Sequence, residues 1–234
     1  MLKFNLVIAA FALLAIGTAS PALADDIADD IEDAVDEIAE SQEVFEEIVG
    51  DPQTSIPPVL LQQSKAVIII TNLGQGGFII GGRYGDGLMV ARQADGSWSH
   101  PAFVSLGGGS VGLQFGGRSS DIVMLVQDHQ TVADIINGGA EFGADLSGTA
   151  GPVSGSLTDP AEVAADDILV YSRSSGLFGG VAFDGSTISF DEERNEAFYG
   201  QLDVTPEQIL LGPNLTPTAS YATLEQALLD AESR

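Results

Sequence analysis

The sequence predicts an α+β, β-rich domain with an antiparallel, closed or nearly closed, barrel-like sheet of many short strands and a few peripheral helices. After residue 65, short runs of alternating or β-branched residues follow one another between glycine turns. The chain holds 28 glycines, which suit the bulges and sharp corners of a strongly curved sheet. It has no cysteine, so its stability must come from burial and backbone pairing, and 44% hydrophobic residues suffice for one core.

Residues 1–24 have the layout of a cleavable signal peptide. Lys3 precedes an apolar run at 6–16, and Ala22-Leu23-Ala24 provides a small-residue exit. The run is shorter than the roughly 20 residues of a membrane-spanning helix, although an uncleaved anchor is the alternative interpretation. We therefore expect cleavage after Ala24 and a periplasmic or secreted protein.

Residues 25–50 are predicted to form an acidic amphipathic helix. The apolar positions that recur every three or four residues are Ile27, Ile31, Val35 and Ile38, and Phe45 and Ile48 extend the same stripe. The opposite face is almost entirely Asp and Glu, whereas a helix lying on a membrane surface would carry Lys and Arg there. We expect this helix to pack on the domain with its acidic face in solvent; the alternative is docking on a cationic protein partner.

Residues 51–234 are predicted to form the β-rich part of the same globular domain. The ranges with strand patterns are 66–71, 78–82, 88–93, 103–106, 111–115, 122–126, 141–146, 149–156, 168–172, 177–183 and 187–190. The apolar run Ile122 to Val126 is continuous, which indicates a strand covered on both faces. Gly85-Asp86-Gly87 and Asp95-Gly96 are interpreted as hairpin turns.

A turn followed by a short helix is predicted over 56–63, a short helix over 131–137, and two more helices near the C-terminus. The last two each follow a capping box, Thr205 to Gln208 and Thr223 to Gln226, in which a threonine and a glutamine satisfy free amide groups. The four helices are expected to lie outside the sheet.

The charge of the chain excludes one class of partner. The formal net charge is −26, and no cluster of basic residues interrupts the acidic composition. Because a protein that binds nucleic acid needs a basic footprint, we expect no nucleic-acid partner.

No motif for catalysis or for a cofactor meets its structural requirements. Gly107, Gly109 and Gly112 have the spacing of a dinucleotide fingerprint, but the residues after them alternate as a strand where that site needs a helix. A set of Ser110, His129 and Asp121 could act as nucleophile, base and acid, yet nothing in their spacing selects them. We expect no cofactor and no metal site.

Several stretches in order resemble the SYLF domain family of lipid-binding, actin-patch proteins. They are 76–85, 95–103, 107–112, 143–145, 150–153, 171–174, 176–181, 199–200 and 205–212, and the order and spacing fit over roughly residues 40 to 212. The resemblance implies a non-enzymatic domain that binds phospholipid, with phosphoinositides as ligands of eukaryotic members, and an exported single-domain protein among bacterial members. It therefore makes phospholipid or a membrane surface the expected partner.

Six residues are candidates for the lipid contact, and each also has a structural interpretation. Candidate headgroup contacts are Lys65, Arg83, Arg118 and Arg173, and candidate apolar contacts are Leu177 and Phe178. The cations could instead form surface ion pairs, and the two apolar side chains could belong to the core. The leading hypothesis is an exported lipid-binding protein; the alternatives are an acidic envelope scaffold and, third, an unrecognised hydrolase.

Overall fold

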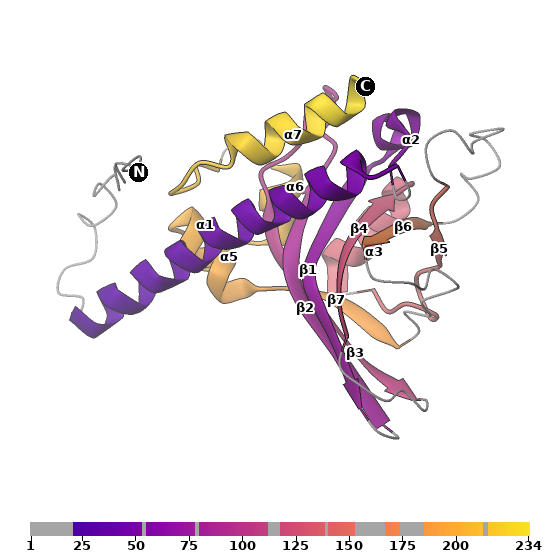
Figure 1. The fold of residues 1–234 in the computed structure, drawn as a ribbon. Helices are drawn as coiled ribbons and strands as arrows, with labels where there is room; N and C mark the ends of the chain where they lie inside the picture. The colour runs from indigo at the N-terminus through magenta and orange to yellow at the C-terminus, as the bar shows by residue number, and fades with distance from the viewer. Residues whose placement is uncertain are drawn as a thin grey trace, which may run out of the picture.

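A curled, seven-stranded sheet forms the centre of the computed structural model, which describes residues 21–52, 55–77, 80–111, 118–138, 140–152, 167–173, 185–212 and 215–234 (Figure 1). The strands are β1 Ala66–Gly77, β2 Ile80–Ala91, β3 Ala102–Val111, β4 Arg118–Val126, β5 Gly148–Ala150, β6 Ile168–Arg173 and β7 Ser186–Phe190. The helices are α1 Pro21–Gly50, α2 Pro58–Gln63, α3 His129–Gly138, α5 Glu192–Tyr199, α6 Pro206–Leu211 and α7 Ala222–Glu232. The predicted strand at 177–183 lies outside the described residues.

The sheet is open and mixed, with the strand order β5-β6-β4-β1-β2-β3-β7. The prediction of a β-rich α+β domain is confirmed, but a closed and purely antiparallel sheet is wrong. β5 pairs with β6 in parallel, which the long connection 151–167 permits because parallel neighbours need a crossover. At the other edge, the expected strand at 141–146 is a turn. Its Phe142 N donates a hydrogen bond to Ser186 O of β7 over 2.8 Å.

Helix α1 covers one face of the sheet and lies on the same side as α7 (Figure 1). Its buried face consists of Ala34, Ile38, Ser41, Val44, Phe45, Ile48 and Val49. The predicted apolar stripe is confirmed at Ile38, Phe45 and Ile48. Val35 is instead 37% exposed, and Ala34 beside it is buried. The predicted cleavage position after Ala24 falls inside the first turns of this helix.

β1 and β2 form a long antiparallel hairpin, where the sequence predicted three shorter strands at 66–71, 78–82 and 88–93. A bulge interrupts the register between Thr71 and Gly74, where Asn72 has a positive φ of 48°, a conformation that asparagine tolerates. Gly85-Asp86-Gly87 is not a turn but lies inside β2. A Cβ on Gly87 would lie 1.9 Å from Ile69 O, so glycine is needed there for the two coiled strands to approach.

The core lies where the strands run beneath the helices. Ile122 to Val126 are all buried, as predicted for a strand covered on both faces. Phe103 of β3 meets Phe198 of α5 edge to face with ring centroids 5.2 Å apart. The amide of Asn195, also in α5, bonds both backbone groups of Phe103, so this helix is fixed to the sheet by packing and by hydrogen bonds.

The C-terminal helices confirm one capping box and contradict the other. α6 begins with the predicted box, in which Thr205 and Gln208 bond each other's backbone amides. α7 begins at Ala222, whose amide donates to Ser220 Oγ, so Thr223 lies inside the helix and caps nothing. The sequence did not predict α5, which Asp191 caps by accepting from Arg194 N and Gly200 ends in the left-handed conformation.

Arg92, at the end of the β1–β2 hairpin, connects three separate segments. Its guanidinium lies 3.8 Å from the ring centroid of Trp98, and its other partners are Ser64 O, Leu61 O, Gly96 O and the Glu232 carboxylate. α2, the Asp95-Gly96 turn and the end of α7 are therefore held by one side chain.

Candidate functional site

The structure brings two of the four predicted cationic positions together. Gln75 of β1 pairs with Arg83 on one side and with Arg118 on the other. Because neighbouring strands lie about 4.8 Å apart, the backbones of the two arginines are about 10 Å apart at the same level of the sheet. The side chain of Arg83 is half-buried. This pair, Arg83 and Arg118, lies at the glycine-rich end of the long strands.

Lys65 and Arg173 lie elsewhere. Lys65 precedes β1 and accepts from Arg92 N, ten residues along the strand from Gln75, or about 30 Å. Arg173 ends β6, opposite Asp121, and its guanidinium forms an ion pair with Glu47 of α1. Of the four candidate headgroup cations, only Arg83 and Arg118 therefore lie at one level on strands next to the same strand. The candidate apolar contacts Leu177 and Phe178 lie outside the described residues.

Arg173 lines a small acidic pocket, of about 230 Å³, between α1 and the sheet. The acidic side chains that line it are Glu40, Glu43, Glu47 and Asp121. Asp121 Oδ1 accepts from Asn72 N over 3.1 Å, and Glu40 accepts from the Asn72 amide, so the bulge in β1 is tied to α1 and β4. An anionic ligand would meet repulsion from these carboxylates before it reached Arg173.

Glu37, next to this pocket, is a carboxylate at the contact between α1 and the sheet. Its Oε1 accepts from Thr71 Oγ1 over 3.0 Å and from Ser41 Oγ over 3.2 Å. Burial raises the pKa of Glu37 above its ordinary value, although both hydrogen bonds oppose that shift. The interface between α1 and the bulge is thus polar, unlike the apolar interface around Phe45.

The histidines do not form a catalytic set. His100 Nδ1 lies 2.6 Å from the Tyr221 hydroxyl, which joins β3 to α7. His129 is exposed at the start of α3, whose first amides are bonded by Asp128. Asp121 is five residues of β4 before Val126, or roughly 16 Å, so it lies far from His129. The arrangement of Ser110, His129 and Asp121 therefore cannot relay a proton.

The glycine fingerprint also lacks its structural context. Gly107 and Gly109 lie within β3, and the next described element is β4, a strand where a pyrophosphate site needs a helix. Within the described ranges, no group of three His, Asp or Glu side chains could hold a metal ion. A search of the same residues finds no helix with the length and apolar character to cross a membrane.

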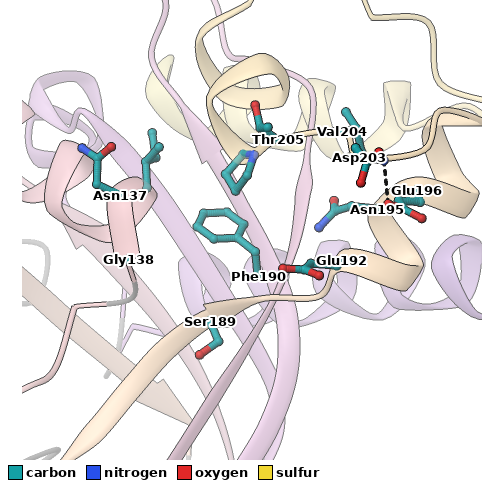
Figure 2. Close-up of a pocket in the computed structure, with 12 residues that line it drawn as sticks. Asn137, Gly138, Ser189, Phe190, Glu192, Asn195, Glu196, Asp203, Val204 and Thr205 are labelled. Atoms are coloured by element: carbon teal, nitrogen blue, oxygen red, sulfur yellow. Dashed lines mark hydrogen bonds between the residues drawn. The ribbon is translucent and has the colours of Figure 1, made fainter.

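A larger cavity, of about 510 Å³, lies between the end of α3, the junction of β7 with α5, and the segment that leads into α6 (Figure 2). Sequence reasoning missed it because its lining comes from three stretches with no shared motif. The only signal was the acidic run 191–196, which supplies Glu192 and Glu196 to the lining.

These features define a class: an α+β domain with a curled, glycine-rich sheet, a helix-covered core and charged surface sites, whose described residues contain no converging catalytic group. The family described as "Las17-binding protein actin regulator" (Ysc84) matches residues 107–231. The chain therefore belongs to the Ysc84 family, the SYLF family that the sequence resemblance indicated.

Curated relatives have about a third of their residues identical to those of the chain over the aligned segments. Protein YSC84 of Saccharomyces cerevisiae is 35% identical over 169 residues, covering 70% of this chain and 36% of that protein. SH3 domain-containing YSC84-like protein 1 of Homo sapiens is 30% identical over 182 residues, covering 77% and 52%. LAS seventeen-binding protein 3 of S. cerevisiae is 36% identical over 168 residues, covering 70% and 36%. The chain spans about a third to a half of the length of these relatives.

Proposed function

We propose that this protein is an exported, non-catalytic lipid-binding protein that holds an anionic phospholipid headgroup near Arg83 and Arg118. The shared register position of these two residues on either side of Gln75 carries the proposal. Two arginines whose backbones are about 10 Å apart can contact separate phosphate oxygens of one headgroup or of neighbouring lipids. Membership of the SYLF family supports the same ligand class.

The surroundings of the pair favour a surface ligand. The residues that follow Gln75 in β1 and those opposite it in β2 include Gly76, Gly77, Gly81 and Gly82. Glycine has no side chain to keep a flat ligand away from the backbone, so headgroup oxygens can approach amide groups there. Because the whole chain carries a net charge of −26, attraction to an anionic membrane must be local to this end and sensitive to salt.

Flotation with lipid vesicles tests the proposal. We expect the full chain to float with vesicles containing anionic phospholipid at low salt, and less with zwitterionic vesicles. Each cation near an anionic leaflet contributes about 1 kcal/mol, so Arg83→Gln with Arg118→Gln should weaken association about 30-fold. Lys65→Gln with Arg234→Gln removes the same charge far from the site and should change it less than threefold. Equal losses in the two double variants, or no flotation of the wild type, would contradict the proposal.

A second candidate function is docking of a cationic protein on α1. The observation that favours it is the long exposed acidic face of this helix, which includes Asp29, Glu32, Asp33, Asp36 and Glu43. The name of one relative, LAS seventeen-binding protein 3, and the description of the family both refer to binding of Las17, which makes a protein ligand for this chain a testable alternative. Pull-down with Glu32→Gln and Asp36→Asn should lose a partner that depends on this face and leave vesicle flotation unchanged.

Export is tested on the expressed protein. Intact-mass analysis of material from the periplasm or medium should give a chain that begins at Asp25. A chain that stays in the cytoplasm with its first residues intact would reject export and leave the vesicle test unaffected.

A further inference from the structure

We propose that the cavity between α3, α5 and the segment before α6 binds an alkylammonium group, that is, a protonated amine on an aliphatic stem. The proposal is independent of lipid binding, because the cavity is built from segments other than the end of the sheet that carries Arg83 and Arg118. At about 510 Å³, it has the size of a site for a small organic ligand or for one or two side chains of a partner.

The charge of the lining selects a cation. Glu192, Glu196 and Asp203 all line the cavity, and none of its described lining residues is basic. Arg194, in the same helix α5, lies over the Phe103 ring at 6.0 Å and 3.6 Å from Asp191, so it neutralises neither glutamate of the cavity in a close pair. A cation that entered would therefore meet carboxylates without a competing positive charge.

The end of α3 adds to this negative potential. Ile136, Asn137 and Gly138 are the last residues of a ten-residue helix, and all three line the cavity. The last carbonyl groups of a helix have no partner within it and carry the negative end of its dipole. They can accept from an ammonium group, which has three donors and no acceptor.

The apolar part of the lining selects an organic cation over a simple ion. Phe190, Pro206, Ile136 and Val204 supply apolar surface beside the carboxylates. Figure 2 shows the Phe190 ring between Asn137 on one side and Glu192 with Asn195 on the other. An aliphatic stem would bury its methylenes against this ring while its charged end meets carboxylate, as lysine side chains do elsewhere. The described residues offer no set of three ligands for a metal ion.

The cavity is held open by hydrogen bonds rather than by the ligand. Glu196 Oε1 accepts from Asp203 N over 2.6 Å, which fixes the loop between α5 and α6 (Figure 2). Asn195 is buried and bonded to Phe103 and Asp191, so the α5 wall is fixed to the sheet. The side chains of Glu192 and Asp203 are the exposed carboxylates left to bind the ligand. Little order must be gained on binding, which favours a small ligand.

An NMR titration of the full chain, labelled with nitrogen-15, tests the site. The probes are Nα-acetyl-lysine N-methylamide, which stands for a lysine side chain, and 1,5-diaminopentane, which stands for a free amine, both at 150 mM salt. We expect saturable shifts at the amides of Gly138, Ser189 and Val204. The same lysine derivative acetylated on its ε-nitrogen has the stem without the charge, and it should cause no saturable shift.

Matched variants separate the cavity from general attraction to an acidic protein. Glu192→Gln with Asp203→Asn should weaken binding at least tenfold; asparagine suits position 203, where φ is 55°. Glu32→Gln with Asp36→Asn changes the charge equally on the exposed face of α1 and should weaken binding less than twofold. Binding of both probes, or of the diamine alone, supports the site and distinguishes a protein side chain from a free amine as the source. Equal losses in both double variants, shifts spread over the acidic surface, or no saturable shift would overturn the proposal.

Discussion

The long strands of the sheet pass through two environments that differ in composition and in role. Under the helices, residues such as Ile68, Met89 and Phe103 are completely buried. Beyond the bulge at Asn72, the same strands carry glycines, arginines and Tyr84, whose side chain is 58% exposed. Hydrogen bonds pair β1, β2 and β3 along both parts of their length. The buried end, which is fixed by packing, can therefore hold the exposed end in its conformation. The packed end supplies stability, and the proposed lipid contact lies at the opposite end of the same strands.

The sharpest test of this difference compares an aromatic residue from each end. Phe103→Ala leaves a cavity beside Phe198 and should lower the free energy of unfolding by about 3–5 kcal/mol. Tyr84→Ala, at the exposed end, should lower it by less than about 1 kcal/mol. Urea unfolding followed by circular dichroism measures both. Similar losses in the two variants would show that the exposed end contributes to the core.

Two glycines test where the coiling of the strands requires close approach. Gly87→Ala would place a Cβ 1.9 Å from Ile69 O, so the backbone must shift and the free energy of unfolding should fall by about 2–3 kcal/mol. Gly109→Ala, in β3, has no atom within 4 Å of the added Cβ and should change it by less than about 0.5 kcal/mol. The same urea experiment applies, and a tolerant Gly87 would mean that β1 and β2 separate more easily than their packing suggests.

The smallest effect concerns Glu37, at the boundary between the two ends. Its pKa is raised by burial above the ordinary 4.5, so between the two values the folded state binds more protons than the unfolded state. The contribution of Glu37 to stability is therefore present below about pH 4.5 and is lost as pH rises through the higher, folded-state pKa. Glu37→Gln keeps an oxygen for Thr71 and should stabilise the protein at pH 7 by less than about 1 kcal/mol, with no gain at pH 4.

Urea unfolding of wild type and variant between pH 4 and 8 measures this difference. Glu32→Gln, exposed on the same helix, removes the same charge without burial and serves as the control. A gain in Glu37→Gln that is equal at all pH values, or no larger than that of the control, would contradict the role of burial.

The sequence predicted the elements that depend on local pattern. Ile122 to Val126, the capping box at Thr205 and the helix over 25–50 follow from residue spacing alone, and the structure confirms them. Helix α5 was missed because its outer residues are polar, and its stability comes from the packing of Phe198 on Phe103, far away in the sequence. The prediction of a closed sheet was wrong for a similar reason, since non-local contacts decide which strands pair at the edges.

The candidate sites were less predictable than the fold. Arg83 and Arg118 share a level because the single extra residue of the bulge in β1 shifts its pairing with β2 and its pairing with β4 by the same amount. A slip of one residue in the pairing of β2 alone, or of β4 alone, would move one arginine to the other face of the sheet. The ion pair between Arg173 and Glu47 joins β6 to α1 and had no signal in the spacing of either segment.

The hydrogen bonds and the ion pair of Arg92 couple the local unfolding of separate parts of the chain. A side chain that bonds α2, the Asp95-Gly96 turn and Glu232 cannot release one of them without weakening its hold on the others. Amide hydrogens in α7 and in this turn should therefore exchange with solvent as one unit, although more than a hundred residues of sequence lie between them.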